Sequence, residues 1–392
     1  MRIGIVVDNE FDHDVRVRSQ HKLLKESFNE VFVLCFDHGT EGLMKEDSIF
    51  RVKMSRKRKN MLYGVQNTYD GYGMLWKRAI RMFVSQLQLD VVHVHDLYMG
   101  LPAKLALKGL DCKLILDLHE NYPETVASQT WAIKGWKKFL AKPGKWKQKE
   151  KKYLLGADKI VVLSDHFKGE LTERYPIEDE RFVVFPNVPT IEQYDQVEHS
   201  MPDGPLTLAY YGGIGVRRGV FEVMEALIND PRLTEVRLKL IGPVDGNDRT
   251  RFDHLLAQLG KRCEHVLWID NRELGNAIRD AHVCLSPIYK NKQHESGVAN
   301  KVFQYMMFGK PLIVSNCAPQ QKVVEDAQCG WVFEDRNEES LIAVIHNVAQ
   351  LSNVDLSAVG KRGHKAVMDH YNMNFYGSRL TEAYLELASK PS

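Results

Sequence analysis

Apolar residues along this chain gather in short, β-branched runs that alternate with longer amphipathic stretches. In the first half of the chain the runs lie at residues 2–7, 31–36, 91–95, 113–119, 159–164 and 182–187. In the second half they lie at residues 206–212, 236–242, 266–270, 283–288, 311–316 and 330–334. Continuous apolar runs of this length are typical of strands that helices bury on both faces. The pattern therefore predicts an α/β protein with parallel, doubly wound sheets.

The pattern occurs twice, and a polar stretch that holds three prolines separates the two occurrences at residues 187–205. We interpret this stretch as an interdomain linker. The predicted organisation is a first Rossmann-like domain over residues 1–188, a linker over 189–205 and a second such domain over 206–372. Ligands of open α/β sheets bind beyond the carboxyl ends of the strands. Functional residues are therefore expected just after the strands, facing a cleft between the domains.

Composition narrows the class of protein. Hydrophobic residues make up 44% and charged residues 27% of the chain, as in soluble globular proteins, and a net charge of +2 provides no overall field that would select nucleic acid. The six cysteines are scattered and form no CxxC pair, which favours a reducing compartment. The first residues reach an acid too early for a signal peptide, and no apolar run approaches the ~20 residues of a membrane span. We expect a cytoplasmic protein.

Basic residues are concentrated in two segments, residues 51–59 and 134–153. The second segment holds nine lysines, one glutamate and the tryptophans Trp136 and Trp146. Lysine favours anionic lipid and tryptophan favours the headgroup region, so the stretch Lys134–Lys152 resembles an anchor to an anionic membrane surface. Such an anchor would place the protein peripherally at the inner face of the cell membrane. A solvated helix face is the alternative, and no binding motif supports nucleic acid.

A glycine-rich turn follows the first predicted strand of the second half, in "YYGGIGVRRGVFEVMEAL". Arg217 and Arg218 lie there at a predicted helix N-terminus, where cations are unfavourable unless an anion joins them. The glycines at 213, 215 and 219 do not have the spacing of a dinucleotide fingerprint, and no acid follows the next strand. The turn predicts a phosphate or diphosphate site rather than an NAD site, with an ordinary glycine turn as the alternative.

A second loop-to-helix segment, "HESGVANKVFQYMMFGKP", offers complementary groups. We predict a helix from Val298 to Phe308 that ends at Gly309, entered through a loop whose amides face the ligand. Lys301 would join Arg218 as a counterion of a diphosphate. Gln304 could bind a ribose diol, and Glu295 could hold sugar hydroxyls. The alternative is an amphipathic helix with a polar cap.

The stretch "ANKVFQYMMFGKPLIVS" resembles the "PNKLFEYMAxGKPVIxS" stretch of the GT-B-fold, family 4 retaining glycosyltransferases. "FDHDVRVRSQHKLL", "LILDLHENYPE", "VVFPNVP", "YYGGIGVRRG" and "YNMNFYGSRLTEAYLEL" resemble further landmarks of that family in the right order. The resemblance implies two Rossmann-like domains facing across a cleft, with a final segment, residues 373–392, that packs back on the first. It implies a UDP- or GDP-sugar donor and no cofactor or bound metal. The donor site it implies consists of Gly213, Arg218, Ser296, Gly297, Val298, Lys301 and Gln304.

The resemblance also implies roles in the first domain. His119 corresponds to the histidine beside the donor sugar and, with Glu295, is assigned to catalysis. A strand-end histidine can donate a hydrogen bond to a sugar hydroxyl or to charge developing at the anomeric centre. Acceptor binding is assigned to Asp14, Arg16, Asp96 and Glu120. Asp96 is included because of its position, since it directly follows a predicted strand and should face the cleft.

Two short patterns in this domain could indicate a metal. The pair His93 and His95 could ligate zinc, but the sequence suggests no third ligand nearby. The "DHD" at residues 12–14 resembles a metal-binding DxD motif, but it follows the first strand of a chain whose likeness is to a family that works without metal.

We therefore expect a retaining glycosyltransferase that moves a sugar from a nucleotide-diphosphate donor to a saccharide or lipid-linked acceptor in cell-surface polysaccharide biosynthesis. One alternative is a non-hydrolysing nucleotide-sugar epimerase, which shares the two-domain architecture. Another is a non-catalytic sugar-nucleotide-binding homologue, because Gln304 replaces a glutamate and Gly213 an arginine that the family often shows. The sequence does not name the base, which we expect to be bound by backbone groups near residues 268–271.

Overall fold

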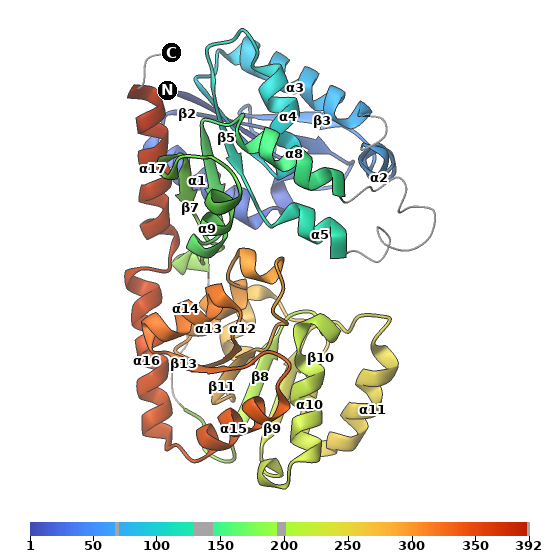
Figure 1. The fold of residues 1–392 in the computed structure, drawn as a ribbon, viewed down its shortest axis with the longest axis vertical. Coiled ribbons are helices and arrows are strands. Elements are labelled where there is room, and N and C mark those ends of the chain that lie inside the picture. The colour runs from blue at the N-terminus through green and yellow to red at the C-terminus, as the bar shows by residue number, and fades with distance from the viewer. Residues whose placement is uncertain (67–69, 129–143, 194–200, 390–392) are drawn as a thin grey trace. The chain divides into compact units, whose positions relative to one another are not determined.

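A computed structural model describes residues 1–66, 70–128, 144–193 and 201–389 of the protein (Figure 1). The chain forms two compact units, one built from Met1–Pro186 with Tyr376–Ser392 and the other from Asn187–Phe375. Residues 194–200 of the predicted linker and residues 134–143 of the basic segment, with Trp136, lie outside the described residues. Each unit is described by itself.

The first unit contains a seven-stranded parallel sheet in the order β3-β2-β1-β4-β5-β6-β7. Its strands are β1 (Arg2–Val6), β2 (Glu30–Asp37), β3 (Ile49–Lys53), β4 (Val91–His95), β5 (Lys113–Asp117), β6 (Lys159–Val162) and β7 (Phe182–Val184). Its α-helices are α1 (Val15–Ser27), α2 (Arg56–Val65), α3 (Gly71–Leu87), α4 (Gly100–Ala106), α5 (Tyr122–Ser128), α8 (Gly144–Leu154), α9 (Asp165–Arg174) and, from Tyr376 onward, α17 (Met373–Ser389). Short 3-10 helices lie at η1 (Phe11–His13), η2 (Leu97–Met99) and η3 (Asp179–Arg181).

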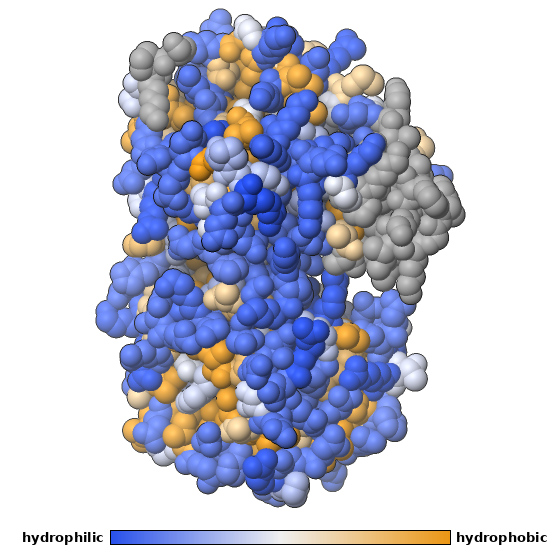
Figure 2. Space-filling view, in the orientation of Figure 1, coloured by the Kyte–Doolittle hydropathy of each residue, from blue (hydrophilic) through white to orange (hydrophobic). Residues whose placement is uncertain are grey.

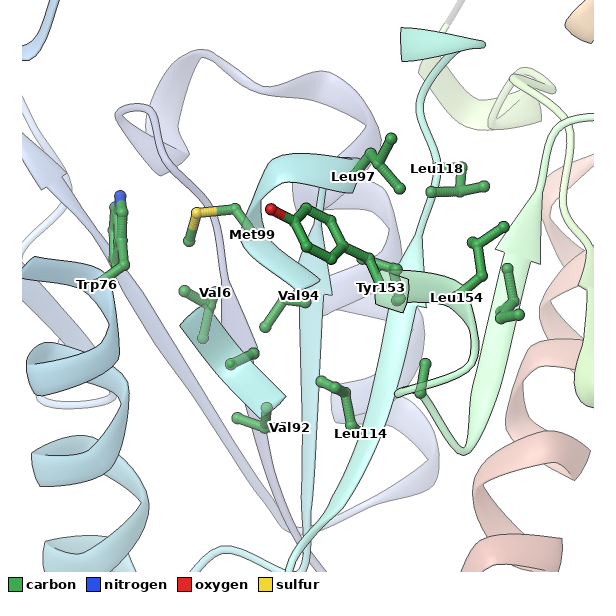
Figure 3. Close-up of a cluster of buried hydrophobic side chains, with 14 of the residues drawn as sticks. Val6, Trp76, Val92, Val94, Leu97, Met99, Leu114, Leu118, Tyr153 and Leu154 are labelled. Carbon is green, nitrogen blue, oxygen red and sulfur yellow. The ribbon is translucent and has the colours of Figure 1, made fainter. Parts of the chain in front are cut away.

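Alternation along β4 sends its side chains to two different environments. Val92 and Val94 join a buried hydrophobic cluster that includes Trp76 of α3 (Figure 3). His93 and His95 point to the opposite face of the sheet, where the Nδ1 of His93 lies 2.7 Å from the hydroxyl of Tyr384 on α17. The central strand therefore carries an apolar face toward α3 and a polar face toward α17.

The second unit contains a six-stranded parallel sheet in the order β10-β9-β8-β11-β12-β13. Its strands are β8 (Thr207–Tyr211), β9 (Arg237–Ile241), β10 (Cys263–Val266), β11 (Val283–Ser286), β12 (Leu312–Ser315) and β13 (Gly330–Phe333). Its α-helices are α10 (Val220–Asn229), α11 (Arg249–Leu259), α12 (Leu274–Ala277), α13 (Asn300–Met307), α14 (Ala318–Ala327), α15 (Glu338–Ala349) and α16 (Asn353–Asp369). Short 3-10 helices lie at η4 (Ile191–Gln193), η5 (Val216–Arg218), η6 (Pro231–Leu233), η7 (Gly260–Arg262), η8 (Asn271–Glu273) and η9 (His294–Ser296).

The two parallel sheets confirm the predicted fold class, with two differences at sheet edges. The edge strand Ile49–Lys53 was not predicted, because its residues are only partly buried and merge into a basic segment. The predicted strand at residues 266–270 is wrong in its position, since the edge strand is Cys263–Val266. The apolar residues that suggested it, Leu267 and Trp268, are 62% and 74% exposed after the strand has ended.

The structure also corrects the interpretation of Trp146 as an interfacial anchor. Its side chain is 3% exposed and lies edge-on to Tyr122 with ring centroids 4.8 Å apart. Burial of this indole holds α8 against α5, so Trp146 is a core residue and is inaccessible to lipid. None of the helices in the described part of the chain combines the length and the apolar character that a membrane span requires.

Candidate functional site

The second unit brings together the loops that follow β8 and β11. The Tyr289 N–H donates to the carbonyl oxygen of Arg217 over 3.1 Å, and the Arg217 guanidinium donates to Gln293 Oε1 over 3.4 Å. These contacts join the predicted glycine-rich turn to the loop that precedes α13. The two segments that the sequence suggested for one anion are therefore neighbours.

Lys301 lies at the start of α13 and reaches across to the end of β8. Its Nζ lies 3.7 Å from the centroid of the Tyr210 ring, which is a cation–π contact. The Tyr210 hydroxyl donates to the carbonyl oxygen of Gly213 over 2.8 Å. The Tyr211 N–H donates to the Tyr305 hydroxyl over 2.7 Å, so α13 is bonded to the strand as well. Two tyrosines thus fix the position of the ammonium and the shape of the turn.

Two glycines of the turn are required by its geometry, and neither is Gly213. Gly212 has φ +130°, and a Cβ there would lie 2.9 Å from Lys301 Nζ. Gly219 has φ +68°, and a Cβ there would lie 1.7 Å from the carbonyl oxygen of Pro287. The positive φ strains any side chain at both positions, and the contact with backbone at Gly219 excludes one there. A Cβ at Gly213 would meet open space, which leaves room for a ligand beside its exposed backbone.

The electrostatics of this site favour an anion. Burial lowers the pKa of Lys301 well below its usual range, and the neighbouring charge of Arg218 lowers it further. Burial and the same arginine also lower the pKa of His294 on the adjoining loop. In the described part of the chain, neither Lys301 nor Arg218 is ion-paired with a carboxylate. Two neighbouring cations without a counterion, one of them desolvated, make a site for a diphosphate.

The remaining predicted donor residues lie on the same loop and helix. Helix α13 begins at Asn300, two residues later than predicted, and Ala299 provides no side-chain cap for its first amides. Ser296 is buried and its hydroxyl donates to the Gln293 carbonyl over 2.7 Å. Gly297 and Val298 connect the short helix η9 to α13.

The side chains of Glu295 and Gln304 are less accessible than the sequence suggested. Glu295 is mostly buried and its carboxylate lies 3.7 Å from Lys290 Nζ. Gln304 lies within the buried part of α13. Roles of these two residues toward a sugar or a ribose stay predictions.

In the first unit, polar groups meet at the carboxyl ends of β4 and β5. His119 Nε2 lies 2.8 Å from His95 Nδ1, and His119 Nδ1 lies 3.9 Å from Asp96 Oδ1. Asp96 has φ +72°, which is strained for a non-glycine residue, and its carboxylate accepts a hydrogen bond from the Tyr98 hydroxyl over 3.0 Å. Burial raises the pKa of Asp96 to about 6. Perturbed titration and backbone strain at a strand end are features of functional sites.

Asp117 is the centre of a fully buried polar cluster beneath this edge. It accepts hydrogen bonds from Arg16 over 3.0 Å and 3.2 Å and from the Gln20 amide over 2.9 Å. His93 Nε2 and His95 Nδ1 each lie 3.6 Å from its Oδ2. Despite burial, Arg16 and the histidines hold the pKa of Asp117 well below its usual range.

The expectation that no third ligand lies near His93 and His95 is wrong. Their ligand atoms and those of Asp117 lie within 4.8 Å of one another. However, the Arg16 guanidinium already balances the Asp117 charge, so a divalent cation would leave excess positive charge in a fully buried site. This donor set fits a hydrogen-bond cluster better than a metal centre.

The other predicted first-unit residues have structural contacts. Asp14 caps α1 by accepting from the Val17 N–H over 3.0 Å, and Arg16 is held in the buried ion pair with Asp117. Asp12 of the DHD segment pairs with Arg51 over 2.9 Å. Glu120 is half-buried next to His119, and burial raises its pKa. Roles of Asp14 and Arg16 in acceptor binding stay predictions.

Sequence reasoning missed several residues that shape these sites. Tyr210 and Gly212 lie against the Lys301 ammonium, Tyr305 bonds α13 to β8, and Asp117 lies beside the histidines. A signal existed for Asp117, because an acid inside the apolar run 113–119 must be paired when it is buried. No comparable signal identified Tyr210 or Tyr305, since aromatic residues in such runs are usually core residues.

Two protein-family models match the chain. Residues 15–189 match the family model described as Glycosyltransferase Family 4, and residues 207–350 match the model described as Glycosyl transferases group 1. No curated protein matches the chain by sequence.

Three solved structures illustrate the shared fold. Sucrose-phosphate synthase from Thermosynechococcus elongatus is similar with a TM-score of 0.77 and 16% identity, covering 99% of both chains. The lipopolysaccharide outer core galactosyltransferase WaaB is similar with a TM-score of 0.70 and 15% identity, covering 98% of this chain and 99% of that chain. HepE from Anabaena in complex with UDP has a TM-score of 0.73 and 12% identity, covering 98% of this chain and 100% of that chain. Both halves of the chain thus match glycosyltransferase models, and the chain belongs to glycosyltransferase family 4 with the GT-B fold.

Proposed function

We propose that the second unit binds the diphosphate of a UDP- or GDP-sugar and that the protein transfers the sugar with retention of anomeric configuration. The observation that carries this proposal is the pair of cations Lys301 and Arg218, which have no carboxylate partner in the described residues. A diphosphate would supply the missing negative charge. The UDP bound to the structural neighbour HepE supports a uridine nucleotide as the first candidate.

On the donor side, the cations and backbone amides would stabilise charge on the leaving diphosphate. Arg218 is exposed and Lys301 is held over Tyr210, so both can meet a ligand without a large rearrangement. The amides at the start of α13 lack a side-chain cap and could donate to phosphate oxygens. No metal is needed in this proposal, because these groups neutralise the diphosphate.

On the acceptor side, the first unit offers His119, Asp96 and Glu120 at the carboxyl ends of β4 and β5. His119 would donate to a sugar oxygen, and the two carboxylates would bind acceptor hydroxyls. In the proposed reaction the acceptor attacks on the face that the nucleotide leaves, and the departing phosphate oxygen takes the acceptor proton. The acceptor is a saccharide or a lipid-linked saccharide, and the galactosyltransferase neighbour favours a cell-surface polysaccharide.

A direct experiment separates this proposal from its alternatives. Radiolabelled UDP- and GDP-sugars are incubated with the protein and lipid-linked or free saccharide acceptors, and the anomeric configuration of the product is read by NMR. Transfer with retention supports the proposal, and transfer with inversion contradicts the stereochemistry. An isomerised donor without transfer indicates an epimerase, and nucleotide binding without turnover indicates a non-catalytic homologue.

We also propose that α8 approaches an anionic membrane surface through its lysines. Lys145, Lys147, Lys151 and Lys152 are exposed, and the buried Trp146 fixes the helix so that these side chains face outward. Hydrophilic residues cover most of the molecular face shown in Figure 2. Attachment would therefore depend on charge rather than on insertion of tryptophan.

A further inference from the structure

The candidate catalytic histidine is bonded to a second histidine that has no assigned role. His119 Nε2 and His95 Nδ1 are 2.8 Å apart, and His95 is fully buried. The same His95 nitrogen lies 3.6 Å from the carboxylate of Asp117, its neighbour in the parallel sheet register. The other ring nitrogen of His95, Nε2, is buried and has no hydrogen-bond partner in the described part of the chain.

These contacts determine which nitrogen of His95 carries its proton. Burial lowers the pKa of His95 well below its usual range, so the ring is neutral and holds one N–H. A proton on Nε2 would be buried without an acceptor, and the lone pair on Nδ1 would face the Asp117 carboxylate. A proton on Nδ1 avoids both costs and can be donated to His119. The Nδ1–H form of His95 is therefore favoured.

The tautomer of His95 in turn determines that of His119. If His95 Nδ1 donates, His119 Nε2 must accept, so a neutral His119 carries its proton on Nδ1. That nitrogen lies 3.9 Å from Asp96 Oδ1, which is too long for a hydrogen bond but electrostatically favourable for an N–H. The His119 N–H remains available for a sugar oxygen.

We propose that His95 is a positioning residue that fixes His119 as the Nδ1–H tautomer, with Asp117 as the fixed anchor. The catalytic consequence rests on the proposed function, since it requires His119 to act on a sugar. The tautomer itself does not, because it is a property of the free protein. With its proton on Nδ1, His119 offers a hydrogen-bond donor, rather than a lone pair, at the carboxyl ends of the strands.

The buried cluster around Asp117 continues to α17. His93 Nε2 also lies 3.6 Å from Asp117, and its Nδ1 lies 2.7 Å from the Tyr384 hydroxyl. Arg16 and Gln20 hold the carboxylate from α1. Asp117 is thus held directly by groups of α1 and β4, and Tyr384 of α17 holds His93 in turn.

Histidine NMR tests the proposal without any substrate. In protein labelled with 15N-histidine, two-bond 15N–1H correlations distinguish the two tautomers, and His119 is assigned by its loss in His119→Gln. We expect the Nδ1–H form in the wild type. His95→Leu should release His119 toward the Nε2–H form that the free histidine side chain prefers. His95→Asn should keep the Nδ1–H form, because its amide can donate from nearly the same place.

Controls separate positioning from folding. His21→Leu replaces another buried histidine, which packs on Phe11, and should leave the His119 signal unchanged. Circular dichroism and thermal unfolding report whether each variant is folded. An Nε2–H signal for His119 in the wild type, or an unchanged tautomer in a folded His95→Leu, would overturn the proposal. If His95→Leu does not fold, the wild-type and His95→Asn spectra still decide.

Kinetics add a second readout once transfer is measured. His95→Leu should lower kcat by about 10- to 100-fold with little change in the donor KM, and His95→Asn should restore most of it. Equal losses in both variants would contradict a positioning role. Absence of transfer in the wild type would count against the proposed function and leave the tautomer result intact.

Discussion

At the scale of single residues, Lys301 is the clearest sign of a ligand. Burial and Arg218 both oppose its positive charge, while the Tyr210 ring gives only partial compensation. A protein that needed this side chain only for stability would pair it with an acid. The unfavourable state of the free ammonium is explained if a bound diphosphate completes the site.

Replacing the ammonium should weaken nucleotide binding. Lys301→Met keeps the length of the side chain and removes the charge, and we expect the affinity for UDP or GDP to fall by roughly 10- to 100-fold, because charge-assisted hydrogen bonds are worth about 1.5–3 kcal/mol. Isothermal titration calorimetry measures this effect. Lys361→Met, at an exposed position of α16, is the matched control. Equal affinity in Lys301→Met and wild type would remove Lys301 from the site.

The lowered pKa of Lys301 predicts how nucleotide binding depends on pH. The pKa of Lys301 is held low in the free protein, so above that pKa the side chain is neutral. A bound diphosphate favours the ammonium and raises its pKa, so binding takes up a proton and the affinity falls as the pH rises. Calorimetry in buffers of different ionisation enthalpy measures the uptake, which Lys301→Met should reduce. His294→Gln reports the contribution of His294, whose pKa is also lowered. Binding without proton uptake in alkaline buffers contradicts this account.

The backbone conformation at Gly212 leads to a prediction about the glycine-rich turn. Alanine there would have to adopt φ +130° and would press its Cβ to 2.9 Å from Lys301 Nζ. We expect Gly212→Ala to destabilise the protein by about 1–3 kcal/mol and to weaken nucleotide binding. Gly246→Ala, which meets no atom within 4 Å, should change neither quantity much. Denaturant unfolding with calorimetry compares the two, and equal behaviour would show that the turn tolerates a side chain.

At the scale of elements, α13 is positioned by its bond to β8. The Tyr305 hydroxyl is buried and accepts from the Tyr211 N–H over 2.7 Å, while Val302, Phe303, Met306 and Met307 are buried as the apolar periodicity predicted. The periodicity indicated which face packs inward. The first residue of the helix, Asn300, could not be derived in this way, because helix ends depend on caps and loop contacts.

Removing the Tyr305 hydroxyl should loosen this connection. Tyr305→Phe leaves the Tyr211 N–H without an acceptor and keeps the ring, so we expect a loss of about 1–3 kcal/mol in the free energy of unfolding. Thermal and denaturant unfolding measure the loss. Tyr63→Phe removes a tyrosine hydroxyl from the first unit and serves as the control. It should change the nucleotide affinity less than Tyr305→Phe does. If Tyr305→Phe is as stable as the wild type, the hydroxyl does not fix the helix.

The apolar pattern of the sequence predicted the central strands better than two of the edge strands. The central strands β1, β4, β8 and β11 are buried on both faces, and their continuous apolar runs predicted them. The edge strands Ile49–Lys53 and Cys263–Val266 are only partly buried, so their sequences need not be apolar. Hydrophobic periodicity reports burial and does not report backbone pairing, which explains both differences.

At the scale of the whole molecule, the uneven distribution of lysine predicts membrane attachment. Lys151→Glu with Lys152→Glu should lower flotation with anionic liposomes by at least about tenfold, because each surface lysine contributes about 1 kcal/mol. Lys261→Glu with Lys361→Glu changes the net charge equally on exposed positions of the second unit. Neutral vesicles should bind neither form. Equal flotation of both double variants would show that α8 is an ordinary solvated face.

The sequence by itself determined the fold class, the two successive parallel sheets, the family and the two neighbouring segments that contain Lys301 and Arg218. These features follow from burial periodicity and from residue types at fixed spacing, which a linear sequence records. Only the tertiary structure decided that Lys301 lies over Tyr210, that Trp146 is buried and that Asp117 lies between two histidines. Those contacts join residues far apart in the chain, and they depend on sheet register and helix packing, which no local pattern encodes.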